Sequence, residues 1–141
     1  MEKQLIFAQT TAPTLPKNGQ LPGSLELAFL GDTIYDLYVR GRVIGNGKVK
    51  KLHAAAAARV NAGAQSEALA RIEDILTEAE QDVVRRARNA KQSPPKNADP
   101  RAYHRATALE ALIGYLYLMG QTERVDALMQ RALAEDGPDN I

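Results

Sequence analysis

Apolar residues recur at helical spacing along most of the chain, and this pattern predicts an all-α fold. Two stretches, Leu25 to Val43 and Ala106 to Met119, are apolar on nearly every face of the helix they would form. Helices of that kind lie in a protein interior or at a subunit interface. No segment alternates β-branched and polar residues as a strand would, and no internal repeat is present.

Capping and turn residues divide the apolar pattern into six predicted helices. Ser24 is the expected N-cap of the first helix, and Gly63 is expected to separate the second from the third. Thr77 followed by Glu80 is a capping-box signature, and Asp99 precedes a proline as at many helix starts. The predicted helices cover residues 25–43, 48–61, 64–75, 77–90, 99–119 and 122–135.

The length of 141 residues fits one domain with short ends. Residues 1–22 contain three prolines and predict an irregular arm, 23–136 the folded domain, and 137–141 a tail. No apolar run approaches the roughly 18–20 residues that span a bilayer, and no signal peptide is evident, so no membrane partner is expected. The absence of cysteine excludes disulfides and suits the cytoplasm, which is the expected location.

Charge is segregated along the chain, although the net charge is only +1. Thirteen of the 18 basic residues lie in two windows, 40–59 and 85–105, whereas residues 67–82 hold six acids and one arginine. Such segregation indicates a candidate binder of polyanions such as nucleic acid. Solvated helix faces are the alternative explanation.

Two carboxylates, Asp32 and Glu110, lie inside the two most apolar predicted helices. Burying an unpaired carboxylate is costly, so each acid needs a partner or a metal ion. Carboxylates from two packed helices would suit one Mg²⁺, which activates water and stabilises charge on a phosphate. Alternatively, Asp32 is half-exposed on a polar strip, and Glu110 pairs with an arginine such as Arg105 or Arg59. The two histidines are not at zinc-ligand spacing.

Around these acids the sequence resembles the ribonuclease III family. Phe29-Leu30-Gly31-Asp32 matches the end of the family signature, and Glu110-Ala111-Leu112-Ile113-Gly114 matches its second acidic motif. Arg86-Ala87-Arg88-Asn89-Ala90-Lys91 matches a basic segment of the short branch, Mini-ribonuclease III, which lacks the separate double-stranded-RNA-binding domain. The three motifs occur in the family's order, and the resemblance covers about residues 22–135.

The resemblance implies a ribonuclease III endonuclease-domain helical bundle that works as a homodimer and cuts double-stranded RNA with Mg²⁺. It implies that Asp32 and Glu110 are the catalytic residues and the magnesium ligands. It also implies that the natural substrate is precursor 23S ribosomal RNA, cut in a paired stem during ribosome maturation. The residues assigned to RNA contact are Arg86, Arg88, Asn89 and Lys91, together with Arg85, which joins them by charge and position only.

Three positions depart from the longer members of the family. Leu25 and Ala28 stand where the signature has glutamates, and Thr107 stands where the second motif has an aspartate. The short branch is reduced in the same way, and the reduction leaves fewer protein ligands for the metal. Asp36, one turn beyond Asp32, is a candidate for a water-mediated contact. Two other functions stay open: a catalytically inactive RNA-binding or ribosome-assembly protein of this fold, and a structural all-α dimer.

Overall fold

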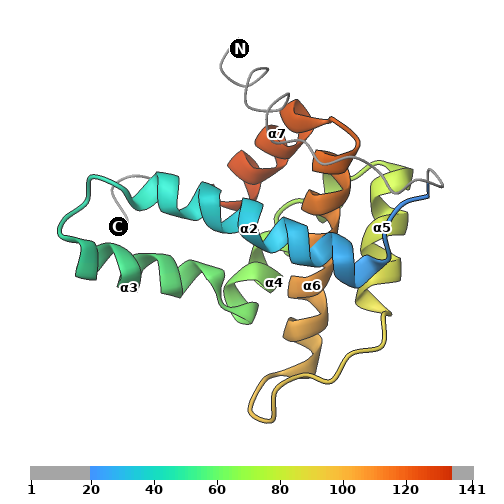
Figure 1. Cartoon of the computed structure of the whole chain (residues 1–141), viewed down its shortest axis with the longest axis horizontal. Coiled ribbons are helices and arrows are strands. Elements are labelled where there is room, and N and C mark those ends of the chain that lie inside the picture. The colour runs from blue at the N-terminus through green and yellow to red at the C-terminus, as the bar shows by residue number, and fades with distance from the viewer. Residues whose placement is uncertain (1–19, 135–141) are drawn as a thin grey trace.

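The helix α6 (Pro100–Leu118) runs through the middle of the molecule, and the other helices pack around it (Figure 1). This computed structural model describes residues 20–134. The other elements are α2 (Ser24–Val43), α3 (Val49–Val60), α4 (Ala62–Ala70), the short 3-10 helix η1 (Glu73–Ile75), α5 (Glu78–Arg88) and α7 (Thr122–Ala132). The described residues contain no strand, so the predicted all-α class is confirmed.

The central position of α6 follows from its composition. Most of its residues from Ala106 to Tyr117 are small or aliphatic and buried, so the helix offers an apolar surface in several directions. It packs most extensively against α2, and also against α4, α5 and α7. Burial on nearly every side explains why the sequence showed no single apolar stripe here.

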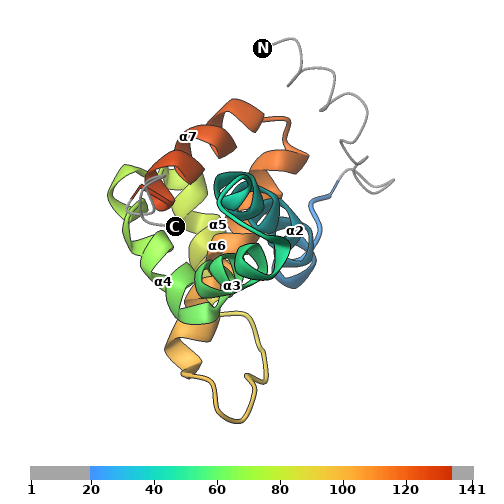
Figure 2. The same ribbon diagram turned by 90° about the vertical axis from the view of Figure 1, so that its left-hand side faces the viewer.

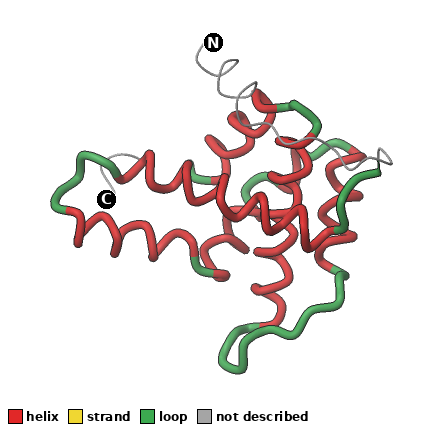
Figure 3. Tube along the Cα trace, in the orientation of Figure 1, coloured by secondary structure: helices red, strands yellow, loops and turns green. Residues whose placement is uncertain are grey.

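The helices α2 and α3 form a hairpin that projects to one side of α6 (Figures 1 and 2). The turn between them contains Gly45 and Gly47, with φ angles of +89° and +121°, which glycine adopts without strain. The Tyr35 hydroxyl donates to the Arg59 carbonyl oxygen at 3.1 Å and ties α2 to the end of α3. On the opposite side, the longest loop of the described chain joins α5 to α6 (Figure 3).

Two of the predicted helix starts are confirmed. The Thr77 hydroxyl accepts from the Glu80 amide at 3.2 Å, and the Glu80 carboxylate accepts from the Thr77 amide at 2.9 Å, which completes the capping box. The Asp99 carboxylate accepts from the Arg101 amide at 3.1 Å. The loop expected at residues 92–97 is also confirmed.

Two other boundary predictions were wrong. Gly23 is the N-cap of α2, and Ser24 is its first helical residue. Gly63 lies inside α4, because the helix is broken two residues earlier at Asn61, whose side chain accepts from the Ala64 amide at 2.9 Å. The last helix ends at Ala132, and the predicted end at residue 135 lies outside the described residues, as do residues 1–19 of the arm and the tail. The domain limits at 23 and 136 stay a prediction.

A buried ion pair joins α5 to α7. The Arg124 guanidinium donates to both oxygens of Glu80 at 2.8 Å and to the Ile75 carbonyl oxygen at 2.8 Å. These hydrogen bonds from Arg124 lower the pKa of Glu80, against the opposing effect of burial. The buried carboxylate of Glu80 is therefore paired within the fold. Among the described residues, no helix is both long enough and apolar enough to cross a membrane.

Candidate active site

Two glycines bring the backbones of α2 and α6 into direct contact. A Cβ atom on Gly31 would lie 1.7 Å from the carbonyl oxygen of Glu110, and one on Gly114 would lie 2.0 Å from that of Leu27. Any other residue at either position would force the helices apart. Because Asp32 follows Gly31, and Glu110 lies one turn before Gly114, the same crossing brings the two acids together.

The carboxyl groups of Asp32 and Glu110 lie close enough to interact with each other. Asp32 is exposed, whereas Glu110 is half-buried. Burial raises the pKa of Glu110 to about 8, and the hydrogen bond and negative charge of Asp32 act in the same direction. A divalent ion bound between two neighbouring carboxyl groups would stabilise their charged forms.

Gln65 of α4 is a third member of this site, and the sequence analysis missed it. Its side chain is only 3% exposed, and its amide Nε2 donates to Oε2 of Glu110 at 3.2 Å. One signal was present in the sequence. Gln65 shares a helical face with Ala68, Leu69 and Ile72, all buried, so a polar side chain there requires a buried partner.

Arg105 does not pair with Glu110, and that alternative was wrong. Its guanidinium donates to the Glu73 carboxylate at 2.8 Å and to the Ser66 hydroxyl at 2.9 Å. It therefore links α6 to α4 and η1. The other named arginine, Arg59, donates to the Ala55 carbonyl oxygen at 2.7 Å within its own helix.

The donor set suits magnesium better than a metal that needs a protein cage. Mg²⁺ commonly binds through one or two carboxylates and keeps several waters, which matches the pair of Asp32 and Glu110. Within residues 20–134 no group of three or more His, Cys, Asp or Glu side chains surrounds a common point. Asp36 forms an ion pair with Arg40 at 3.0 Å.

Thr107 occupies the position where longer family members have an aspartate, and its hydroxyl is already engaged. It donates to the Tyr103 carbonyl oxygen at 3.1 Å and accepts from the Gln92 side-chain amide at 3.2 Å. Both partners belong to α6 or to the loop before it. The hydroxyl therefore stabilises the start of α6 and the preceding loop.

The basic segment predicted to contact RNA lies at the C-terminal end of α5 and in the residues that follow. All five of its members are exposed: Arg85, Arg86, Arg88, Asn89 and Lys91. Arg85 and Arg86 both pair with Asp82, Arg86 at 3.1 Å. Within the described chain, Arg88 and Lys91 have no ion-pair partner, so their charges are available for an anionic ligand. Figure 1 places this end of α5 beside the N-terminal half of α6.

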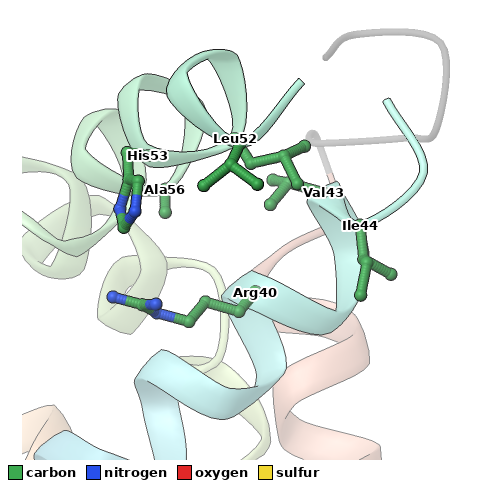
Figure 4. A pocket seen from close by; sticks show the side chains of 7 residues that line it. Arg40, Val43, Ile44, Leu52, His53 and Ala56 are labelled. Atoms are coloured by element: carbon green, nitrogen blue, oxygen red, sulfur yellow. The ribbon is translucent and has the colours of Figure 1, made fainter. Parts of the chain in front are cut away.

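A separate apolar pocket lies between the end of α2 and the start of α3 (Figure 4). Val43, Leu52 and Ala56 line it, and Arg40 and His53 approach one another at one end. It contains no carboxylate, so it does not offer the chemistry found at the helix crossing. His53 is exposed.

Comparisons with known proteins agree with this architecture. The family model described as Ribonuclease III domain matches residues 25–121. The protein named Mini-ribonuclease 3 from Thermoanaerobacter sp. (strain X514) is 42% identical over 134 residues, covering 92% of this chain and 94% of the relative. The Mini-ribonuclease 3 of Symbiobacterium thermophilum is 50% identical over 111 residues, covering 77% and 85%. A crystal structure of a protein from Fusobacterium nucleatum matches with a TM-score of 0.74 and 33% identity, covering 81% of this chain and 93% of that one.

The helical bundle and its crossing of α2 and α6 thus form a ribonuclease III domain, the fold of a class of endoribonucleases. The chain belongs to the ribonuclease III family, in the branch of the proteins named Mini-ribonuclease 3. The predicted family and enzyme class are therefore confirmed. As members of this family, such enzymes act on double-stranded RNA and generally use divalent metal ions.

Proposed function

We propose that this endoribonuclease is a magnesium-dependent homodimer that cuts double-stranded RNA with Asp32 and Glu110. The observation that carries the proposal is the crossing at Gly31 and Gly114, which brings two interacting carboxyl groups together from distant parts of the sequence. We further propose that it works in the cytoplasm on a paired stem of precursor 23S ribosomal RNA. The family resemblance supports that substrate, and the lack of cysteine suits that compartment.

The acids would act through a metal ion, because two carboxylates repel a phosphate and cannot bind it directly. When bound, Mg²⁺ would supply an activated water and would stabilise negative charge on the phosphate. Asp32 is exposed and therefore accessible to a phosphate in a groove-bound duplex. Glu110 lies behind it and would hold the ion from the protein side.

The exposed basic segment after α5 would hold the RNA backbone. Proteins recognise A-form RNA mainly through its shape, its phosphates and its 2′-hydroxyl groups. Arg88 and Lys91 supply uncompensated positive charge for phosphates, and Asn89 adds hydrogen-bonding groups. The exposed Lys48, which is the N-cap of α3, and Lys50 and Lys51 within α3 extend positive charge onto the hairpin. Because these contacts are between positive side chains and phosphates, RNA binding should depend strongly on salt concentration.

An exposed apolar stripe on α2 supports the homodimer. Leu25, Phe29 and Leu37 are 45%, 84% and 57% exposed, and their spacing in multiples of four places them on one side of the helix. Exposed apolar patches mark interfaces. Asp32 lies on the same helix, so pairing two copies through α2 would bring their sites to one face of the dimer.

One experiment tests the proposed activity. A long RNA duplex is incubated with the protein and Mg²⁺, and the products are separated on a gel beside a reaction that contains EDTA. We expect discrete shortening that requires Mg²⁺ and is lost in Asp32→Asn and in Glu110→Gln. Asp74→Asn is the matched control, because Asp74 is an exposed acid that pairs with Arg131 at 2.9 Å. A precursor 23S stem compared with an unrelated duplex of equal length tests the substrate.

The same gel separates the alternative function from the proposed one. The catalytic pair holds only two carboxylates, and an RNA-binding or ribosome-assembly protein of this fold would need neither. Intact duplex, under conditions where a mobility shift reports binding, would favour that inactive protein. Cleavage by Asp32→Asn at the wild-type rate would remove Asp32 from the mechanism.

A further inference from the structure

The helix α4 contributes a polar contact to the acid pair, although it carries neither acid. Its Gln65 is nearly inaccessible to solvent and donates to Glu110 at 3.2 Å. A buried amide is tolerated only when its hydrogen bonds are made, so the folded site requires this contact. Glutamate has three side-chain torsions, and a bond to one of its oxygens restricts them. The bond therefore holds the Glu110 carboxylate in one orientation, toward Asp32.

An amide is a suitable donor here because it leaves the charge of the carboxylate intact. A lysine or arginine in the same place would neutralise Glu110 and would compete with a divalent cation. Gln65 orients the acid and adds no charge to the site. Within the described chain, no ion pair engages either Asp32 or Glu110, so both carboxyl groups stay available for a metal ion.

Hydrogen bonds from Arg105 to the neighbouring Ser66 fix the position of Gln65 itself. Arg105 of α6 donates to both the hydroxyl and the carbonyl oxygen of Ser66, at 2.9 Å and 3.3 Å, and Ser66 adjoins Gln65 in sequence. The same guanidinium pairs with Glu73 at 2.8 Å, and its side chain is only 12% exposed. These hydrogen bonds of Arg105 set the register of α4 against α6. The amide of Gln65 then meets Glu110, five residues after Arg105 on α6.

We propose that Gln65 is a positioning residue of the active site, which holds Glu110 ready to bind the divalent ion that the reaction uses. The inference rests on the proposed function. Groups that orient a metal ligand by hydrogen bonding usually contribute about 10-fold to 100-fold in metal affinity or activity. The expected defect of a Gln65 variant is therefore in metal use and not in RNA binding.

The test compares Gln65→Met, which keeps the length of the side chain and removes the donor, with the wild type. Gln81→Met is the matched control, because the Gln81 amide donates to the Leu76 carbonyl oxygen at the start of α5. We expect Gln65→Met to need about 10-fold more Mg²⁺ for half-maximal single-turnover cleavage. Mn²⁺ binding without RNA, followed by electron paramagnetic resonance, should weaken similarly. Duplex binding in EDTA should stay within about twofold, and Gln81→Met should match the wild type.

A second measurement uses the wild-type protein and does not depend on the variant folding. In nuclear magnetic resonance spectra, the side-chain amide signals of Gln65 should shift saturably as Mg²⁺ is added, whereas those of Gln81 should stay constant. A wild type that cleaves normally, with unmoved Gln65 signals or with an unchanged Mg²⁺ requirement in Gln65→Met, would overturn the positioning role alone. A wild type that neither cleaves nor binds Mn²⁺ would overturn the proposed function and this inference together.

Discussion

Gly31 lies directly against the carbonyl oxygen of Glu110, which a Cβ atom on Gly31 would approach to 1.7 Å. The separation of the two acids is therefore set by the spacing of the two backbones and not by the packing of side chains. A backbone atom cannot move aside as the end of a flexible side chain can. The glycine is thus needed by the site as much as by the fold.

Gly31→Ala should therefore destabilise the protein by about 3 kcal/mol or more, since overpacking at this contact must separate α2 from α6. Chemical denaturation measures the change in the free energy of unfolding. Gly41→Ala is the control in the same helix, because a Cβ there meets nothing within 4 Å. It should stabilise by roughly 0.5–1 kcal/mol. Equal stability of the two variants would contradict the close approach.

The pKa of Glu110 predicts how stability depends on pH in metal-free buffer. The folded protein holds the Glu110 proton up to about pH 8, whereas the ordinary value of 4.5 applies to the unfolded chain. Between these values the folded state binds more protons, so the free energy of unfolding falls as the pH rises, by at most about 1.4 kcal/mol per pH unit. Below this range the stabilising effect is fully present.

Urea denaturation in EDTA at pH 5, 6.5 and 8 measures this contribution as the difference between the wild type and Glu110→Gln. The free energy of unfolding of Glu110→Gln should lack this decrease with pH, because its amide carries no charge to bury. The variant should therefore gain stability relative to the wild type as the pH rises to 8. Parallel pH profiles for the two proteins would mean that Glu110 titrates near its ordinary value.

Arg88→Ala should weaken duplex binding and leave the chemistry intact. Arg88 is exposed and lacks an ion-pair partner in the described chain, so its charge is free for a phosphate. Loss of one phosphate contact should reduce the salt dependence of binding by about one in the logarithmic slope. Binding titrations over a range of salt measure it, beside single-turnover cleavage at saturating RNA. Arg131→Ala is the control, because Arg131 of α7 pairs with Asp74 of η1. A large loss of chemistry in Arg88→Ala would argue against simple RNA contact.

Phe29→Glu should convert the proposed dimer to monomer, because it places a charge in the exposed apolar stripe of α2. Sedimentation velocity measures the oligomeric state at several concentrations. Val49→Glu is a matched control, since Val49 is 66% exposed and lies at the start of α3, outside the stripe on α2. A Phe29→Glu protein that sediments as the wild type does would place the interface elsewhere.

Local signals in the sequence predicted much of the fold. The reciprocal hydrogen bonds of Thr77 and Glu80, and the cap at Asp99, depend on residues close in sequence, and both predictions were confirmed. At Asn61 the local signal was misread. A glycine within the next helix looked like the break, whereas the side-chain oxygen of asparagine made the actual cap. Competing turn residues of this kind are resolved by the surrounding packing.

The sequence singled out the two acids of the candidate site but not the residues that hold them in place. Asp32 and Glu110 stood out because they interrupt apolar helices and match a family motif. The partners of Arg105 depend on how α4 and η1 lie against α6, across 32 to 39 residues of sequence. The same holds for Gln65 and Glu110, which are 45 residues apart. Contacts of that range follow from tertiary packing, which a single sequence does not display.

The helix crossing also has a consequence for the protein during its synthesis. A ribosome releases α2 long before it has translated α6, so a growing chain carries Asp32 with no Glu110 beside it. The acid pair requires both helices, and α6 ends only at Leu118. With the proposed roles of the two acids, a nascent chain has no nuclease activity until nearly the whole domain has emerged and folded. The ribosome that makes this enzyme is therefore not exposed to a partly folded nuclease.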